Sequence, residues 1–185
     1  MRRGALILAM VLVACGGGPS GPEAPPTDGT SGPEAPPTDS GAAVDPVLGH
    51  PHDGRLHAAA TSVVITPDSE NHPCPLYMGG TGMNRLAEGV HDDLEAQVLV
   101  LARDDLHAVV VSMDLVGLEA PDTIRMQARV AALGLDPAHL VVSCTHTHSG
   151  PDTIGVWGPD DGVTGRCPPY HDFLAEALGQ AVDGL

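Results

Sequence analysis

The chain has 185 residues, and its 24 acidic against 8 basic side chains give a formal net charge of −16 at pH 7. This acidity argues against nucleic acid or an anionic membrane surface as the partner, since both select clustered Lys and Arg. The length fits one domain. With an aromatic content of only 2%, its core must be built from Val, Leu, Ile and Ala.

Residues 1–15 have the features of an export signal, because Arg2 and Arg3 precede an apolar run too short to span a bilayer as a helix. The run ends in Leu-Val-Ala-Cys15, which resembles the lipobox of bacterial lipoproteins, where the cysteine is lipidated and becomes the first mature residue. Gly16 after it resembles lipoproteins released to the outer membrane. The resemblance implies an exported lipoprotein, held at the outer membrane or cell surface through Cys15. The alternative is an ordinary signal peptide in which this cysteine is incidental.

Residues 16–57 are rich in Pro, Gly and acidic side chains and contain the sequence Gly-Pro-Glu-Ala-Pro-Pro-Thr-Asp twice, within two 11-residue repeats. Two copies are too few for a repeat fold. Without large apolar side chains the segment cannot offset the entropy of ordering, so we predict a disordered tether. His50-Pro51-His52 near its end has the H-x-H spacing of a metal site. Because its neighbours supply no rigid geometry, we interpret it as solvated linker.

From residue 58 onward, short apolar runs separated by turn residues indicate a folded domain over 58–185. The patterns predict strands at 62–66, 96–102, 106–113 and 140–144, and helices at 121–134 and 170–182. The order β-β-β-α-β-α predicts an α/β domain with a mixed sheet. The strands are almost continuously apolar, which predicts burial on both faces.

The segment 143–152 begins where the last predicted strand ends, a position at which open α/β sheets gather binding residues. In an extended backbone His146 and His148 project to the same side, so both imidazoles can address one point, as a zinc ion or a polarised carbonyl requires. Two histidines do not complete a zinc site, which needs three or four protein ligands. The alternative is a pair of loop histidines bonded to neighbouring hydroxyl groups.

This segment contains Thr-His-Thr-His-Ser-Gly-Pro after Leu-Val-Val-Ser, and it resembles the neutral/alkaline (non-lysosomal) ceramidase family. Four earlier segments resemble the opening strand, the glycine-rich active-site loop, the lead-in to the next strand and a further strand end of that family: 64–67, 77–83, 89–101 and 111–117. The resemblance covers roughly 58–185. It implies the incomplete N-terminal portion of a larger catalytic domain, belonging to a zinc amidohydrolase that cleaves ceramide to sphingosine and a fatty acid.

The resemblance also assigns roles to single residues. His146 matches a zinc ligand, and His148 matches a residue beside the scissile amide that orients it or stabilises the developing oxyanion. Gly79 matches a loop glycine whose backbone comes close to the reacting centre. His91 and Asp114 occupy motif positions without an assigned role; the alternative for both is hydrogen bonding that fixes the loop and the strand end.

The family's remaining ligands, a second His, a Glu and a Tyr, lie further along a much longer chain and have no counterpart here. With one zinc ligand of about four, no tight site is expected. The expected partners are a lipid amide and the missing C-terminal part, and activity of this chain alone is left open. One alternative is a non-catalytic lipoprotein module that binds a partner through exposed apolar faces. Another is a different H-x-H metal hydrolase, which the position of Asp152, six residues after His146 rather than four, disfavours.

Beyond Cys15 the chain has three cysteines, an odd number for an exported protein, so one should be unpaired. Cys144 lies in a predicted buried strand and fits a small core residue. Cys74 and Cys167 lie in loops beside prolines and could form a disulfide in an oxidising compartment. The sequence alone leaves that pairing open.

Overall fold

The computed structural model describes residues 47–185; the predicted export signal and most of the predicted tether lie outside these residues. One sheet has the strand order β1-β2-β3-β4, formed by β1 (His57–Val64), β2 (Glu95–Arg103), β3 (Leu106–Met113) and β4 (Leu140–Cys144). The helices are α1 (Ala120–Ala132) and α2 (Pro168–Asp183), with two short 3-10 helices, η1 (Val47–Gly49) and η2 (Pro137–His139). None of the helices within 47–185 is long and apolar enough to cross a membrane.

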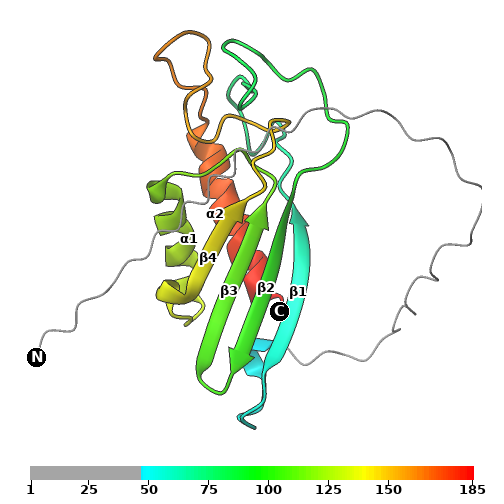
Figure 1. The fold of residues 1–185 in the computed structure, drawn as a ribbon, viewed down its shortest axis with the longest axis vertical. Coiled ribbons are helices and arrows are strands. Elements are labelled where there is room, and N and C mark those ends of the chain that lie inside the picture. Colours follow the sequence, from blue (N-terminus) through cyan, green and yellow to red (C-terminus); the bar gives the residue numbers. More distant parts are fainter. Residues whose placement is uncertain (1–46) are drawn as a thin grey trace, which may run out of the picture. The chain divides into compact units, whose positions relative to one another are not determined.

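The sheet is mixed. β1 pairs with β2 and β2 with β3 in antiparallel fashion, whereas β3 and β4 are parallel. A tight turn at Asp104 and Asp105 joins β2 to β3. A parallel pair needs a crossover connection, and α1 supplies it between β3 and β4 (Figure 1). The order of elements and the mixed sheet confirm the predicted fold class.

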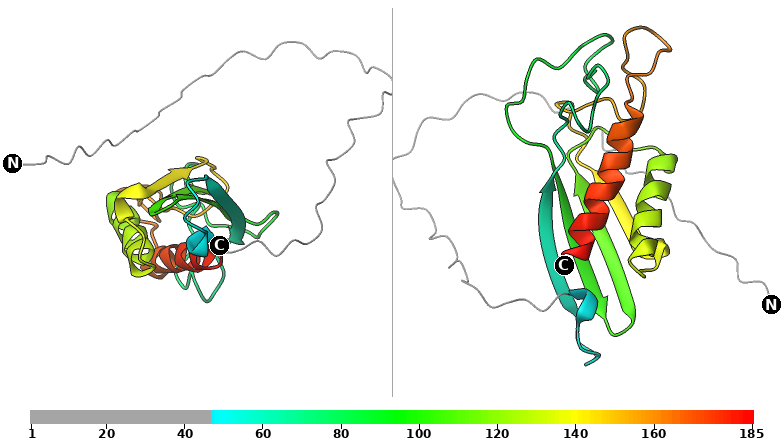
Figure 2. Two further views of the ribbon diagram at one scale, coloured as in Figure 1. Left: turned by 90° about the horizontal axis from the view of Figure 1, so that it is seen from below. Right: turned by 180° about the vertical axis from the view of Figure 1, so that it is seen from behind.

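The core lies between the two helices and one face of the sheet (Figure 2). Alternate residues of β2, from Ala96 to Ala102, pack there with Met126 of α1 and Leu174 of α2. The opposite face of the sheet is less buried. Its apolar residues are only partly covered, with Val141 still 56% exposed. The predicted burial of the strands on both faces is therefore wrong for the described residues, because both helices pack on the same side.

The folded unit includes residues 47–57, which the composition assigns to the tether. Leu48 of η1 packs against the core, His50 is only 7% exposed, and β1 already begins at His57. The interpretation of His50 as part of a solvated linker is wrong. Within this Pro- and Gly-rich segment, Leu48 is an apolar side chain that packs against the core, and η1 contacts β1 and β2.

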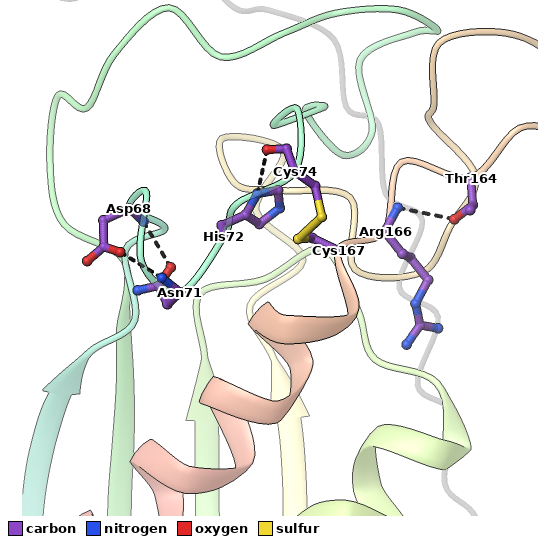
Figure 3. Close-up of a disulfide and its surroundings, with 7 residues drawn as sticks. All are labelled: Asp68, Asn71, His72, Cys74, Thr164, Arg166 and Cys167. Atoms are coloured by element: carbon purple, nitrogen blue, oxygen red, sulfur yellow. Dashed lines mark hydrogen bonds between the residues drawn. A yellow bond between two sulfur atoms is a disulfide. The ribbon is translucent and has the colours of Figure 1, made fainter.

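A disulfide ties the loops above the sheet to the start of α2 (Figure 3). Cys74 and Cys167 are bonded, with their Cα atoms 5.7 Å apart and 93 residues between them in sequence. The ring of His72 packs under this connection and its Nδ1 lies 3.2 Å from the carbonyl oxygen of Cys74. Cys144 is a free, half-buried thiol, and burial raises its pKa to about 11.

A buried carboxylate joins the N-terminal ends of the two helices. Asp122, 1% exposed in the first turn of α1, accepts hydrogen bonds from Arg166 at 2.9 Å and from Nδ1 of His171 at 3.0 Å. Arg166 also contacts Glu119. Burial by itself raises the pKa of Asp122, but the hydrogen bond from His171 and the charges of His171 and Arg166 outweigh it and lower the pKa on balance.

Candidate functional site

The predicted site residues meet at one edge of the sheet. β1, β3 and β4 run in the same direction and β2 runs against them, so three strand ends and the start of β2 share this edge. In Figure 1 the loops from these ends rise above the sheet. Such an edge is where the backbone leaves the ladder and side chains become available for binding.

His146 is held by the loop that follows β3. Its backbone N–H donates to the carbonyl oxygen of Leu115 at 3.1 Å, and its Nδ1 lies 2.6 Å from the carbonyl oxygen of Val116. A carbonyl only accepts, so Nδ1 must carry the proton and Nε2 keeps the lone pair. A backbone carbonyl often orients metal-binding imidazoles in this way.

The backbone of His146 is also unusual, with a φ of 62°. A non-glycine residue in the left-handed region costs about 1–2 kcal/mol. The bonds to Leu115 and Val116 hold it there. Strain of this kind clusters at functional sites.

His148 lies beside His146, with ring centroids 5.1 Å apart in an edge-on arrangement. Gly80 packs directly against the His148 ring: a Cβ added to Gly80 would lie 2.5 Å from Cγ of that ring, and Gly80 has a φ of 90°. Only glycine fits both conditions. The glycine-rich loop therefore meets the histidine pair through Gly80.

Gly79, the residue before Gly80, packs against Val116 and Gly150 and not against an imidazole ring. Its N–H donates to the carbonyl oxygen of Gly150 at 2.9 Å, and an added Cβ would lie 2.9 Å from the side chain of Val116. Gly79 thus seats the loop between the two segments that carry and orient His146. Two adjacent glycines in the sequence give no sign of this division of roles.

A pocket of about 760 Å³ adjoins the histidine segment. Thr147 and Ser149, which alternate with the two histidines, are among its lining residues, whereas His146 and His148 are not. Its other walls come from the end of β1, the loop before β2 and the loop after the disulfide, and include Thr66, Pro67, Leu76, Met78, Leu94, Asp93 and Asp114. The walls combine apolar surface with carboxylates.

Asp114 and His91 take different places around this pocket. The carboxylate of Asp114 accepts from the N–H of Glu95 at 3.2 Å, so it joins the end of β3 to the start of β2 within the pocket wall. The side chain of His91 is 96% exposed at the rim and pairs with Asp92 at 2.7 Å. Asp114 is built into the site, while His91 faces solvent.

Sequence reasoning used Asp152 only for its spacing from His146 and missed its role in shaping the loop above the site. Asp152, 1% exposed, accepts hydrogen bonds from the N–H groups of Gly155, Trp157 and Gly165 at 2.7, 3.0 and 3.1 Å. These bonds offset the cost of burying the charge. The only sequence signal is an aspartate directly after the motif, followed by closely spaced glycines.

The hydrogen bond to the Val116 carbonyl leaves the Nε2 lone pair of His146 available to a ligand such as a metal ion. The ring of His148 lies beside it. Within residues 47–185, however, no group of three or more His, Cys, Asp and Glu side chains is placed to hold a metal ion. A complete zinc site at this edge of the sheet would therefore need ligands beyond the described residues.

These features define an α/β domain with a histidine-bearing site at the strand-end edge of a mixed sheet. No family model and no curated protein matches the chain. Solved structures, in contrast, do match the chain. The crystal structure of neutral ceramidase from Pseudomonas aeruginosa matches with a TM-score of 0.56 and 19% identity, over 71% of this chain and 21% of that chain.

A second structure, a ceramidase complexed with C2, matches with a TM-score of 0.56 and 20% identity over the same shares. The chain has a ceramidase-like fold and spans about a fifth of the length of these structures.

Proposed function

We propose that this chain contributes one part of the active site of a ceramidase-type zinc amidohydrolase, which hydrolyses the N-acyl amide of ceramide to sphingosine and a fatty acid. The observation that carries the proposal is the orientation of His146 by the Val116 carbonyl, with His148 5.1 Å away, on a ceramidase-like fold. His146 would contribute one zinc ligand through Nε2. The remaining ligands would come from polypeptide outside residues 47–185.

His148 would act on the amide itself. A neutral imidazole keeps one ring N–H, and this group can donate a hydrogen bond to the oxygen that becomes negative during amide cleavage. Gly80 supports this role, because a side chain at that position would displace the ring. His148 would thereby orient the amide and stabilise the oxyanion.

The adjoining pocket would receive the lipid amide. Its volume is in the range of small-molecule sites. Leu76, Met78 and Leu94 offer apolar surface for hydrocarbon, while Asp93 and Asp114 offer acceptors for the hydroxyl groups of a sphingoid base. Both chemistries lie beside the segment that carries the histidines.

The N-terminal sequence supports a surface location for this activity. We propose that Cys15 is lipidated and that the following tether holds the domain at the outer membrane or cell surface. Mass spectrometry of the mature N-terminus tests this. A lipid-modified Cys15 is expected, and an unmodified N-terminus at any other residue would contradict it.

A non-catalytic module that binds a partner is the second candidate function. The observation that favours it is the incompletely covered sheet face, where Val64, Val110 and Val141 are exposed. Such a module would need neither zinc nor the histidine pair.

The deciding experiment uses the native product, captured from membranes with an antibody against the repeated octapeptide of the tether. Its mass, zinc content and hydrolysis of a fluorescent N-acyl sphingosine would be measured, beside the 185-residue chain made alone. We expect a product that is larger than the 185-residue chain, binds zinc and releases fatty acid. A native product without zinc and without amide hydrolysis would reject the enzyme and favour the binding module.

A further inference from the structure

Four histidines gather at the opposite end of the sheet from His146. His57 opens β1, His107 is the second residue of β3, and His50 and His52 follow η1. The proposed amidohydrolase function uses none of them. They come from three separate segments of the chain, so their meeting is a product of the fold.

Strand register brings two of these histidines into one row. His57 lies opposite Ala102 of β2, and Ala102 lies opposite His107 of β3. Residues directly opposite each other share a face of the sheet, and the buried Ala102 shows that this is the face covered by the helices. The small alanine leaves room between the two imidazoles.

His50 occupies that room. η1 packs against β1 and β2 and carries the following segment over the end of the core. The ring centroid of His50 lies 4.9 Å from that of His57 and 5.5 Å from that of His107. His52 is the nearest fourth ring, at 6.0 Å from His50.

These separations match a metal centre. Two imidazoles bound to one tetrahedral zinc ion, with Zn–N bonds of about 2.0–2.1 Å, have ring centres about 5 Å apart. The rings do not yet converge: among the described residues no three donors surround a common point. Rotation of the rings about their side-chain bonds, with the backbone unchanged, is what binding would require.

Two further observations favour a cation at these histidines. The Nε2 atom of His107 is buried and has no hydrogen-bond partner within the described part of the chain. A buried nitrogen without a partner is costly, and a metal bond would remove that cost. Oδ1 of Asp53 lies 3.1 Å from Nε2 of His57, which is the carboxylate–histidine contact that orients metal ligands and leaves Nδ1 for the ion.

We propose that His50, His57 and His107 bind one divalent ion of the zinc, copper and nickel class that imidazole ligands prefer, with His52 in reach of a fourth position. The ion would join the segment after η1 to β1 and β3. It would clamp the start of the folded unit onto the sheet, at the end remote from the proposed active site.

The test is zinc binding to the 185-residue chain carrying His146→Ala and His148→Ala, which removes the other histidine pair. Isothermal titration with Zn²⁺ is expected to give one bound ion. Adding His50→Ala or His107→Ala should weaken binding about 100-fold or more, because second-shell changes alone cost about 10–100-fold. His91→Ala, an exposed histidine at the other end of the sheet, is the matched control and should leave affinity unchanged.

A second measurement avoids dependence on variants that fail to fold. Zinc should shift the imidazole NMR signals of His50, His57 and His107 in the same double variant, and Co²⁺ should bind without the charge-transfer absorption of a thiolate ligand. Absence of zinc binding in the double variant would overturn the proposal. So would binding that survives both added substitutions, or zinc that leaves the imidazole NMR signals of His50 and His107 unchanged.

Discussion

The two ends of the sheet hold histidines by different means. At the strand-end edge, His146 and His148 are two residues apart and take their orientation from loop carbonyls and from Gly80. At the opposite end, His57 and His107 are 50 residues apart in sequence and are aligned by strand register across Ala102. Loop geometry can be remodelled locally, whereas register is fixed by the whole ladder. The first arrangement suits chemistry that must adjust around a substrate, and the second suits a fixed clamp.

The largest expected effect belongs to the strand-end edge. In the native product, His146→Ala should abolish both bound zinc and amide hydrolysis, because it removes the proposed zinc ligand. His148→Ala should keep most of the zinc but lower kcat about 10²–10³-fold, the usual cost of one oxyanion donor. Metal analysis and ceramide hydrolysis measure the two effects. Full zinc content and activity in His146→Ala would refute the assignment of the ligand.

Loss of the disulfide should destabilise one end of the sheet more than the other. The bridge between Cys74 and Cys167 spans 93 residues, and removing a bridge over a long loop lowers the free energy of unfolding by about 2–5 kcal/mol. Denaturant unfolding of a Cys74→Ala, Cys167→Ala double variant measures the cost. Hydrogen exchange should rise in residues 68–76 and stay unchanged at the turn between β2 and β3. Equal acceleration at both ends would show that they are not independent.

Acid should lower the free energy of unfolding by protonating Asp122. Its pKa is lowered in the folded state, so the stabilisation is present above its unfolded pKa near 3.8 and is lost as the pH falls through the lower folded value. Asp122→Asn should lower the free energy of unfolding at pH 7 by about 3 kcal/mol, because it leaves the charge of Arg166 partly uncompensated.

Urea unfolding between pH 2 and 7 measures this dependence on Asp122. The difference between wild type and Asp122→Asn should shrink below pH 3.8. A constant difference over that range would contradict the role of the charge.

The smallest effect should distinguish two glycines of one loop. Gly80 and Gly82 both have positive φ, at 90° and 105°, but a Cβ on Gly80 meets the His148 ring while one on Gly82 meets nothing within 4 Å. Gly82→Ala should cost about 1 kcal/mol through backbone strain alone. Gly80→Ala should cost about 1–3 kcal/mol and also lower activity. Thermal unfolding and hydrolysis rates compare the pair, and equal losses would argue against the contact.

The sequence predicts features that are local. Alternating and helical periodicity places the strands and helices, and the contiguous H-x-H motif points to His146 and His148. Orientation is not local: the carbonyl of Val116 that fixes the His146 tautomer is 30 residues away. The histidine cluster at the other end depends on pairing of three strands and on the packing of Leu48 against the core beside His50. Composition assigns that segment to a tether because it counts residues and not contacts.

Cys144 affects how the disulfide persists after it forms. With a pKa of about 11, about one thiol in 10⁴ is ionised at pH 7, and only the thiolate attacks a disulfide. The free cysteine of the sheet is thus a slow partner for exchange with the Cys74–Cys167 bridge. Exchange of the bridge with Cys144 is therefore slower in the folded protein than in an unfolded chain, where this thiol keeps its ordinary pKa.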